Sequence, residues 1–190
     1  MVMQGPLPIF TSPMDALTPK GQQALAIQEQ AVRGFHALRP DLLFLPTNPR
    51  RPIPVDGLIA RRSTGEIVAA VEVKARADMD VATLLDQRRG EWLLSYSKLE
   101  ALAALSRLLG VPGIGWLVLP RDGILLAKRL TEAETGTLCP GIRVENTLTQ
   151  TSCNQPALVE RTNAFIDMTK AAVIELPMAE NHPTDPRLGL

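Results

Sequence analysis

Two short apolar runs in the first half of the chain flank a polar segment that contains a glycine. Residues 55–60 and 67–73 are rich in Val, Ile, Leu and Ala, as buried strands are. The intervening Ser63-Thr64-Gly65 suits a three-residue hairpin loop with glycine in the left-handed position. If Thr64 centres the turn, Asp56 lies opposite Glu72, and a β-bulge would slip this register by one residue.

The same register places Leu58 opposite Ala70 and Ala60 opposite Val68. Side chains alternate along a strand, so Asp56, Glu72 and Lys74 share one face of the hairpin. Both faces are otherwise apolar, which is typical of strands inside a sheet. Two opposed, buried carboxylates repel each other and need a cation. A hard divalent ion such as Mg²⁺ meets this need, and Lys74 is the weaker alternative.

The remaining periodicity predicts an α/β fold. Thr18-Pro19 is a helix start, and a helix over 22–38 carries one apolar stripe. Further elements are expected as strands at 41–46, 114–119, 124–130 and 143–148, a short helix from Asp80 through Leu85, a long helix at 91–109 ended by Gly110, and a helical pattern at 156–174. We therefore expect an extended arm at 1–17, one domain at 18–176 with its core at about 22–130, and a tail at 177–190.

Pro54-Val55-Asp56, followed sixteen positions later by Glu72-Val73-Lys74, resembles the signature of the PD-(D/E)XK nuclease superfamily, which includes restriction endonucleases, Holliday-junction resolvases and RecB-like nucleases. The predicted order of helix, three strands, helix and strand is similar to the core of that superfamily. The resemblance implies a restriction-endonuclease-like mixed sheet flanked by helices, here with a C-terminal helical extension.

The resemblance also implies roles for individual residues. Asp56, Glu72 and the Val73 carbonyl would bind Mg²⁺ or Mn²⁺, and Lys74 would hold the attacking water or stabilise charge in the transition state. Glu29 on the first helix would hold a second metal or a metal-bound water, with a bordering, solvated glutamate as the alternative. Gln87 would lie near the metal, although an exposed glutamine at a helix end is the alternative that the sequence favours.

Composition and charge limit the possible partners. The chain has 190 residues and a formal net charge of zero, which counts against avid, non-specific DNA binding. Three arginine doublets nevertheless offer candidate DNA contacts: Arg50-Arg51, Arg61-Arg62 and Arg88-Arg89. No apolar run approaches the length of a membrane span. Cys139 and Cys153 suggest neither a disulfide framework nor zinc, so a cytoplasmic setting is expected.

Three hypotheses remain open from the sequence. The first is a Mg²⁺-dependent deoxyribonuclease, in which the N-terminal arm joins two protomers. The second is a protein with the nuclease fold that binds nucleic acid or a protein without cutting. The third is a metal-dependent hydrolase acting on a substrate smaller than DNA. Of the two histidines, His36 is interpreted as structural, and His182 lies in the expected tail.

Overall fold

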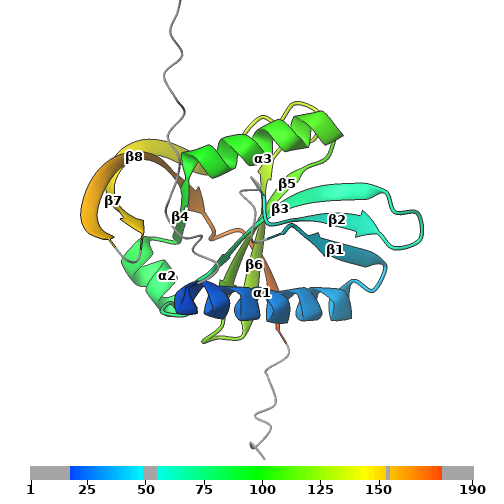
Figure 1. Cartoon of the computed structure of the whole chain (residues 1–190), viewed down its shortest axis with the longest axis horizontal. Helices are drawn as coiled ribbons and strands as arrows, with labels where there is room; N and C mark the ends of the chain where they lie inside the picture. Colours follow the sequence, from blue (N-terminus) through cyan, green and yellow to red (C-terminus); the bar gives the residue numbers. More distant parts are fainter. Residues whose placement is uncertain (1–17, 49–54, 153–154, 177–190) are drawn as a thin grey trace, which may run out of the picture.

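The fold is organised on a six-stranded mixed sheet, in the order β1-β2-β3-β5-β6-β9 (Figure 1). Its strands are β1 (Leu42–Pro46), β2 (Gly57–Arg61), β3 (Ile67–Ala75), β5 (Gly113–Leu119), β6 (Ile124–Thr131) and β9 (Ala172–Glu175). β3 and β5 pair in parallel, and every other neighbouring pair is antiparallel. The computed structural model describes residues 18–48, 55–152 and 155–176, so the expected arm and tail lie outside the described residues.

Three helices accompany the sheet: α1 (Pro19–Leu38), α2 (Val81–Arg88) and α3 (Tyr96–Leu109). α1 begins as the sequence predicts, because the Thr18 hydroxyl accepts a hydrogen bond from the Gly21 N–H at 3.0 Å. Asp80 caps α2 through the Thr83 N–H at 2.7 Å. Gly110 ends α3 with a φ of 66°, in the left-handed region that favours glycine.

The segment after Gly90 differs from the predicted long helix. Residues 91–109 are not one helix, because the first five form strand β4 (Glu91–Ser95) and only the rest form α3. Trp92 and Leu94 are both buried, and their period of two is that of a strand. β4 pairs antiparallel with β8 along its whole length, and this long-range pairing decides the local conformation.

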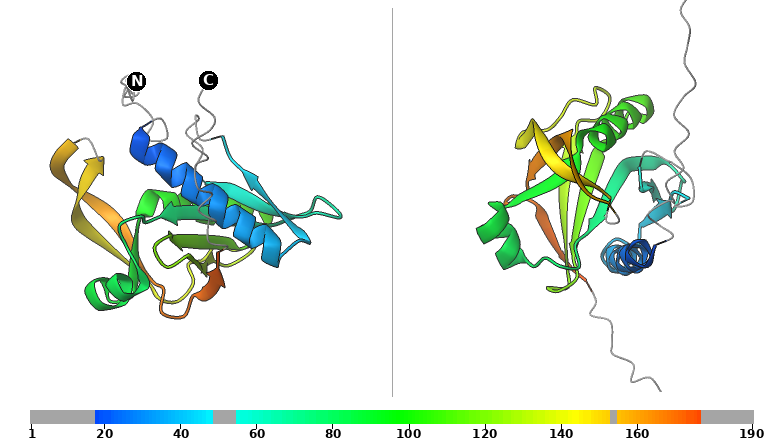
Figure 2. Two further views of the ribbon diagram at one scale, coloured as in Figure 1. Left: turned by 90° about the horizontal axis from the view of Figure 1, so that it is seen from below. Right: turned by 60° about the vertical axis from the view of Figure 1, so that its left-hand side comes forward.

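The predicted C-terminal helical extension is also wrong. The region forms strand β8 (Gln155–Asp167), followed by β9, and contains no helix among the described residues. β8 is the central strand of a second sheet, in the order β4-β8-β7, where β7 spans Ile142–Ser152. Figure 2 shows β7 and β8 as a twisted ribbon that projects from the main sheet. The predicted strand at 143–148 is confirmed and lies within β7.

The main sheet has a separate apolar core on each of its faces. α1 covers one face, where Phe35 and Phe44 pack against Trp116 with ring centroids 5.0 and 5.2 Å apart. α3 and the second sheet cover the other face, which buries Trp92, Leu94, Leu99, Leu102, Leu117, Ala164 and Ile166. Glu72 points into this second core, and Val71 and Val73 point into the first.

The hairpin register is largely as predicted. Leu58 lies opposite Ala70, but a bulge between Ile59 and Ala60 places Ala60 opposite Ile67 instead of Val68. The slip lies at the turn end of the hairpin. The other end, beside Asp56, therefore keeps the predicted register, since Gly57 pairs with Val71.

Polar contacts fix two elements against the sheet. The hydroxyls of Ser106 and Thr131 are 2.7 Å apart, and Thr131 also accepts a hydrogen bond from the Gly113 N–H at 2.9 Å. On the opposite face, His36 Nε2 accepts a hydrogen bond from the Phe44 N–H at 3.0 Å. Burial, and to a lesser extent the charge of Arg62, lowers the pKa of His36 and keeps the imidazole neutral. None of the described helices is long and apolar enough to cross a lipid bilayer.

Candidate active site

Glu72 is the buried charged residue at the centre of the candidate site. It lies in the middle of β3, pairs in register with Gly115 of β5, and its side chain is only 1% exposed. Its Oε1 accepts a hydrogen bond from the Lys98 ammonium. Its Oε2 is buried and has no hydrogen-bond partner among the described residues, which is uncommon for a carboxylate oxygen.

Asp56 lies directly before β2 and is fixed by hydrogen bonds of its side chain and backbone. Its Oδ2 accepts a hydrogen bond from the Val73 N–H at 2.7 Å, and its own N–H donates to the Val71 carbonyl at 3.1 Å. The Asp56 carbonyl accepts a hydrogen bond from the Thr47 N–H at 2.9 Å. Asp56 is thereby held beside Glu72, as the sequence predicts.

Lys98 of α3 is a cation beside the two carboxylates. From the sequence we expect a metal ion or Lys74 in this role. Its Nζ is bonded to Glu72 and lies 3.9 Å from Asp56 Oδ1. Desolvation opposes the charged form of Lys98, but the carboxylates of Glu72 and Asp56 outweigh it, and the pKa of the ammonium is raised. Lys98 therefore stays protonated between the two carboxylates.

The environment of Glu72 favours its protonated form despite this ion pair. Burial is the main cause and the charge of Asp56 the second, and together they raise the pKa of Glu72 to about 7. Lys98 acts in the opposite direction without compensating them fully. When both carboxyl groups are ionised, their two negative charges exceed the single positive charge of Lys98.

Lys74 lies two residues beyond Glu72 on the same face of β3, as predicted. Desolvation of its ammonium, followed by the positive charges of Arg76 and Lys98, lowers the pKa of Lys74. Lys74 as a whole residue is exposed. A less basic ammonium at the solvent side of two carboxylates is suited to hold a water molecule.

The Val73 carbonyl points toward the Asp56 side of the sheet. The N–H groups of Ala70 and Arg76 bond to the Pro112 and Val118 carbonyls on the β5 side. Odd-numbered residues of β3 therefore turn both N–H and C=O toward β2. Since β2 begins only at Gly57, the Val73 carbonyl lies beside Asp56, where it can complete a set of three oxygen ligands.

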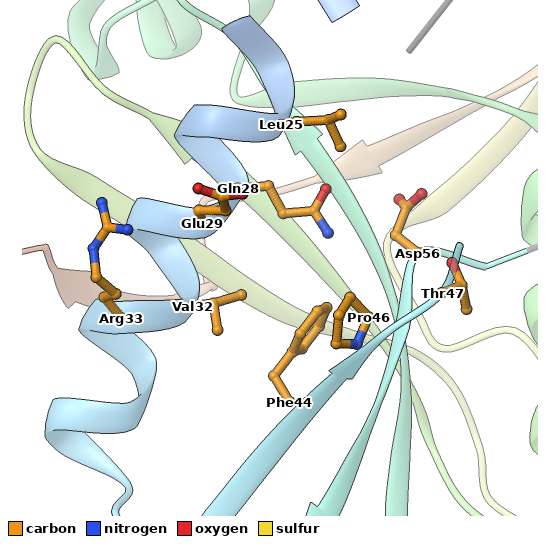
Figure 3. Close-up of a pocket in the computed structure, with 9 residues that line it drawn as sticks. All are labelled: Leu25, Gln28, Glu29, Val32, Arg33, Phe44, Pro46, Thr47 and Asp56. Carbon is orange, nitrogen blue, oxygen red and sulfur yellow. The ribbon is translucent and has the colours of Figure 1, made fainter. Parts of the chain in front are cut away.

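A pocket of about 470 Å³ opens between α1 and β1 and reaches Asp56 (Figure 3). Glu29 lines this pocket, but its carboxylate turns away from Asp56, whereas the Gln28 amide reaches toward it (Figure 3). No group of three or more His, Cys, Asp or Glu side chains in the described part of the chain lies close enough together to hold a metal. Glu29 as a second metal ligand stays a prediction.

The other predicted residues in the described segments belong to α2 or to the turn end of β2. Gln87 is exposed on α2 and is not among the hydrogen-bond partners of Asp56 or Glu72. Arg61 is paired with Glu66, and Arg62 donates to the Pro40 carbonyl, both at the end of β2 far from Asp56. Arg88 and Arg89 end α2, and Arg50 and Arg51 lie outside the described residues.

Sequence reasoning missed two residues of the site, Lys98 and Gln28. Both interrupt an apolar helical pattern: Lys98 precedes the buried Leu102 by four residues, and Gln28 lies between Leu25 and Val32 of the pocket lining. A polar residue on an apolar face was the available signal. No family model matches the chain, and neither a curated protein nor a solved structure matches it, so these contacts are the basis for any functional assignment.

Proposed function

We propose that this protein is a metal-dependent phosphodiesterase that cleaves DNA, with a site of the PD-(D/E)XK type. The observation that carries the proposal is the buried Glu72, whose Oε2 lacks a partner among the described residues while Asp56 lies beside it. Two adjacent carboxylates are the ligands that a hard divalent cation prefers.

The element order supports the same proposal. The chain passes through α1, β1, β2, β3, α3 and β5 in the order that the resemblance implies, with α2 and β4 inserted before α3. The mixed sheet places Asp56 at the start of β2 and Glu72 in the middle of β3. A restriction-endonuclease-like fold is therefore part of the proposal.

Each residue of the cluster would have a separate task. Asp56, Glu72 and the Val73 carbonyl would hold the ion, which supplies Lewis-acid stabilisation of charge on the phosphate. Lys74, on the solvent side, would orient the attacking water and donate hydrogen bonds to the phosphate oxygens. Lys98 would favour the ionised form of Glu72, because its charge lowers the pKa of that carboxyl.

The direct test is to incubate the purified protein with plasmid, linear and branched DNA in Mg²⁺ or Mn²⁺. We expect cleavage that requires the metal and that falls at least ~100-fold in Lys74→Ala and Asp56→Asn. Glu100→Gln, which removes an exposed carboxylate of α3, is the matched control and should cleave normally. Absence of cleavage on all three substrates, with unchanged behaviour of Lys74→Ala, contradicts the proposal.

A second candidate is a nuclease-fold protein that binds nucleic acid or a protein partner without cutting. The observation that favours it is Lys98, whose ammonium already lies between the two carboxylates. Calorimetric titration with Mn²⁺ separates the candidates. Binding that is lost in Asp56→Asn supports the enzyme, whereas no binding to the parent protein, together with DNA affinity retained in Asp56→Asn, supports the second candidate.

A further inference from the structure

A second, smaller pocket lies along the same face of β3. Its volume is about 140 Å³, and it is lined by Arg76, Asp78, Met79, Arg88, Glu91, Trp92, Leu93 and Leu117. Arg76 follows Glu72 and Lys74 at alternating positions, so all three point to one side of the strand. Four residues of extended chain place the start of this pocket roughly 13 Å from Glu72.

The charges that line the pocket favour an anion. Neither Arg76 nor Arg88 has a side-chain ion pair with another residue of the described segments. Both carboxylate oxygens of Glu91 accept hydrogen bonds from Arg143, at 3.1 and 3.0 Å. The lining therefore includes two guanidinium groups without an ion pair, and Asp78 is its one carboxylate without an ion pair among the described residues.

Trp92 and Leu117 form an apolar wall of the pocket, and both are almost fully buried. A wall of low polarity strengthens the attraction between the guanidinium groups and an anion.

The size of the pocket limits what that anion can be. Sites for whole small molecules have volumes of about 300–1,000 Å³, so a pocket of about 140 Å³ takes a single group. Guanidinium groups match the geometry of phosphate oxygens through paired hydrogen bonds. A phosphate group therefore fits the two arginines.

We propose that the pocket of Arg76, Arg88 and Trp92 binds a phosphate group of the nucleic acid, one or more nucleotides away from the bond that is cut at Glu72. The identity of the substrate rests on the proposed function. The pocket itself rests on its own lining residues. It fixes the direction and register of the strand along the β3 face, because phosphate contacts position a nucleic acid without reading its sequence.

The test measures binding in EDTA, where no cleavage occurs, using a fluorescein-labelled single-stranded oligonucleotide and fluorescence anisotropy. We expect Arg76→Gln and Arg88→Gln each to weaken binding by ~10-fold and to reduce the slope of log K against log salt by about 1. Arg107→Gln, an exposed arginine in the last turn of α3, is the matched control.

Two further arms identify the phosphate. Inorganic phosphate should compete with the oligonucleotide on the parent protein and not on Arg76→Gln. If Arg76→Gln weakens binding of 5′-phosphorylated and 5′-hydroxyl oligonucleotides equally, the group is an internal phosphodiester, and if only the former is affected, it is a terminal phosphate. The proposal is overturned if Arg76→Gln and Arg88→Gln lose no more affinity for the oligonucleotide than Arg107→Gln does. Because these binding measurements need no metal, they can confirm the phosphate pocket even in a protein that does not cleave DNA.

Discussion

Lys98 of α3 is ion-paired with Glu72 of β3, which joins the helix layer to the centre of the main sheet. The pair is asymmetric, since Glu72 is 1% exposed whereas the Lys98 side chain is 46% exposed. The carboxylate therefore bears most of the desolvation cost, and the ammonium retains much of its hydration. A cation that approaches from solvent competes with Lys98 for a carboxylate that is already in place.

Removal of the Lys98 charge should destabilise the fold in a pH-dependent way. In Lys98→Met the pKa of Glu72 rises further, because the cation that lowers it is lost. At about pH 8 we expect a loss of about 1–2 kcal/mol in the free energy of unfolding, reduced by solvent screening at the half-exposed lysine. At about pH 5 Glu72 is protonated in both proteins, so the loss should be small. Urea denaturation at both pH values measures it, with the exposed Lys170→Met as control.

Replacement of Glu72 itself should stabilise the protein in alkaline buffer. Its folded pKa of about 7 lies above its usual value of 4.5, so the stability it contributes is present at low pH and lost as pH rises through 7. Glu72→Gln cannot ionise, and we expect it to gain about 1–3 kcal/mol at pH 8 and almost nothing at pH 4. Thermal unfolding of both proteins across this range is the measurement. A loss of stability at pH 8 would show that the ion pair outweighs the burial cost.

His36 should make stability fall in mild acid. Its folded pKa is lowered, so the folded protein resists a proton that the unfolded chain accepts below the usual pKa of 6.5. The stability is fully present above 6.5 and lost as pH falls toward the folded pKa. Urea midpoints from pH 7.5 to 5 should decline more steeply in the parent protein than in His36→Gln, whose amide oxygen can accept the Phe44 N–H. His182 is retained in both proteins, so its contribution cancels.

Gly57 should tolerate no side chain. A Cβ at this position would lie 2.3 Å from Cζ of Phe44, which is buried against Trp116. We expect Gly57→Ala to cost about 1–3 kcal/mol, the usual penalty for overpacking. Phe44→Leu in the same chain should recover part of this cost, because it removes the ring that the new methyl meets. An additive double variant would show that the cost has another origin.

The hairpin could be predicted from the sequence because its signals are local. Two strands joined by a Gly-containing turn specify their own register, and the prediction placed Asp56 and Glu72 together correctly. The bulge at Ile59 changes only the turn end. The short helix after Asp80 and the end of α3 at Gly110 were likewise predictable from capping residues.

The two errors in the prediction have one physical cause. β4 and β8 pair with each other across about seventy residues of chain, and each alone has enough leucine, phenylalanine or isoleucine to suit a helix. The pairing that makes both extended is a tertiary interaction, which overrides local preference. Because residues 91–95 were assigned to the helix, the start of α3 and the role of Lys98 could not be predicted.

The hydroxyl contact between Ser106 and Thr131 has a consequence for protein engineering. It anchors the far end of α3 to β6, while Lys98 at the near end meets β3. Because both ends of α3 are held against the sheet, the helix is restrained from shifting or rotating. The position of the Lys98 ammonium is therefore set by the helix and sheet and not by a surface loop. A different side chain introduced at position 98 would thus lie at a fixed position beside Glu72.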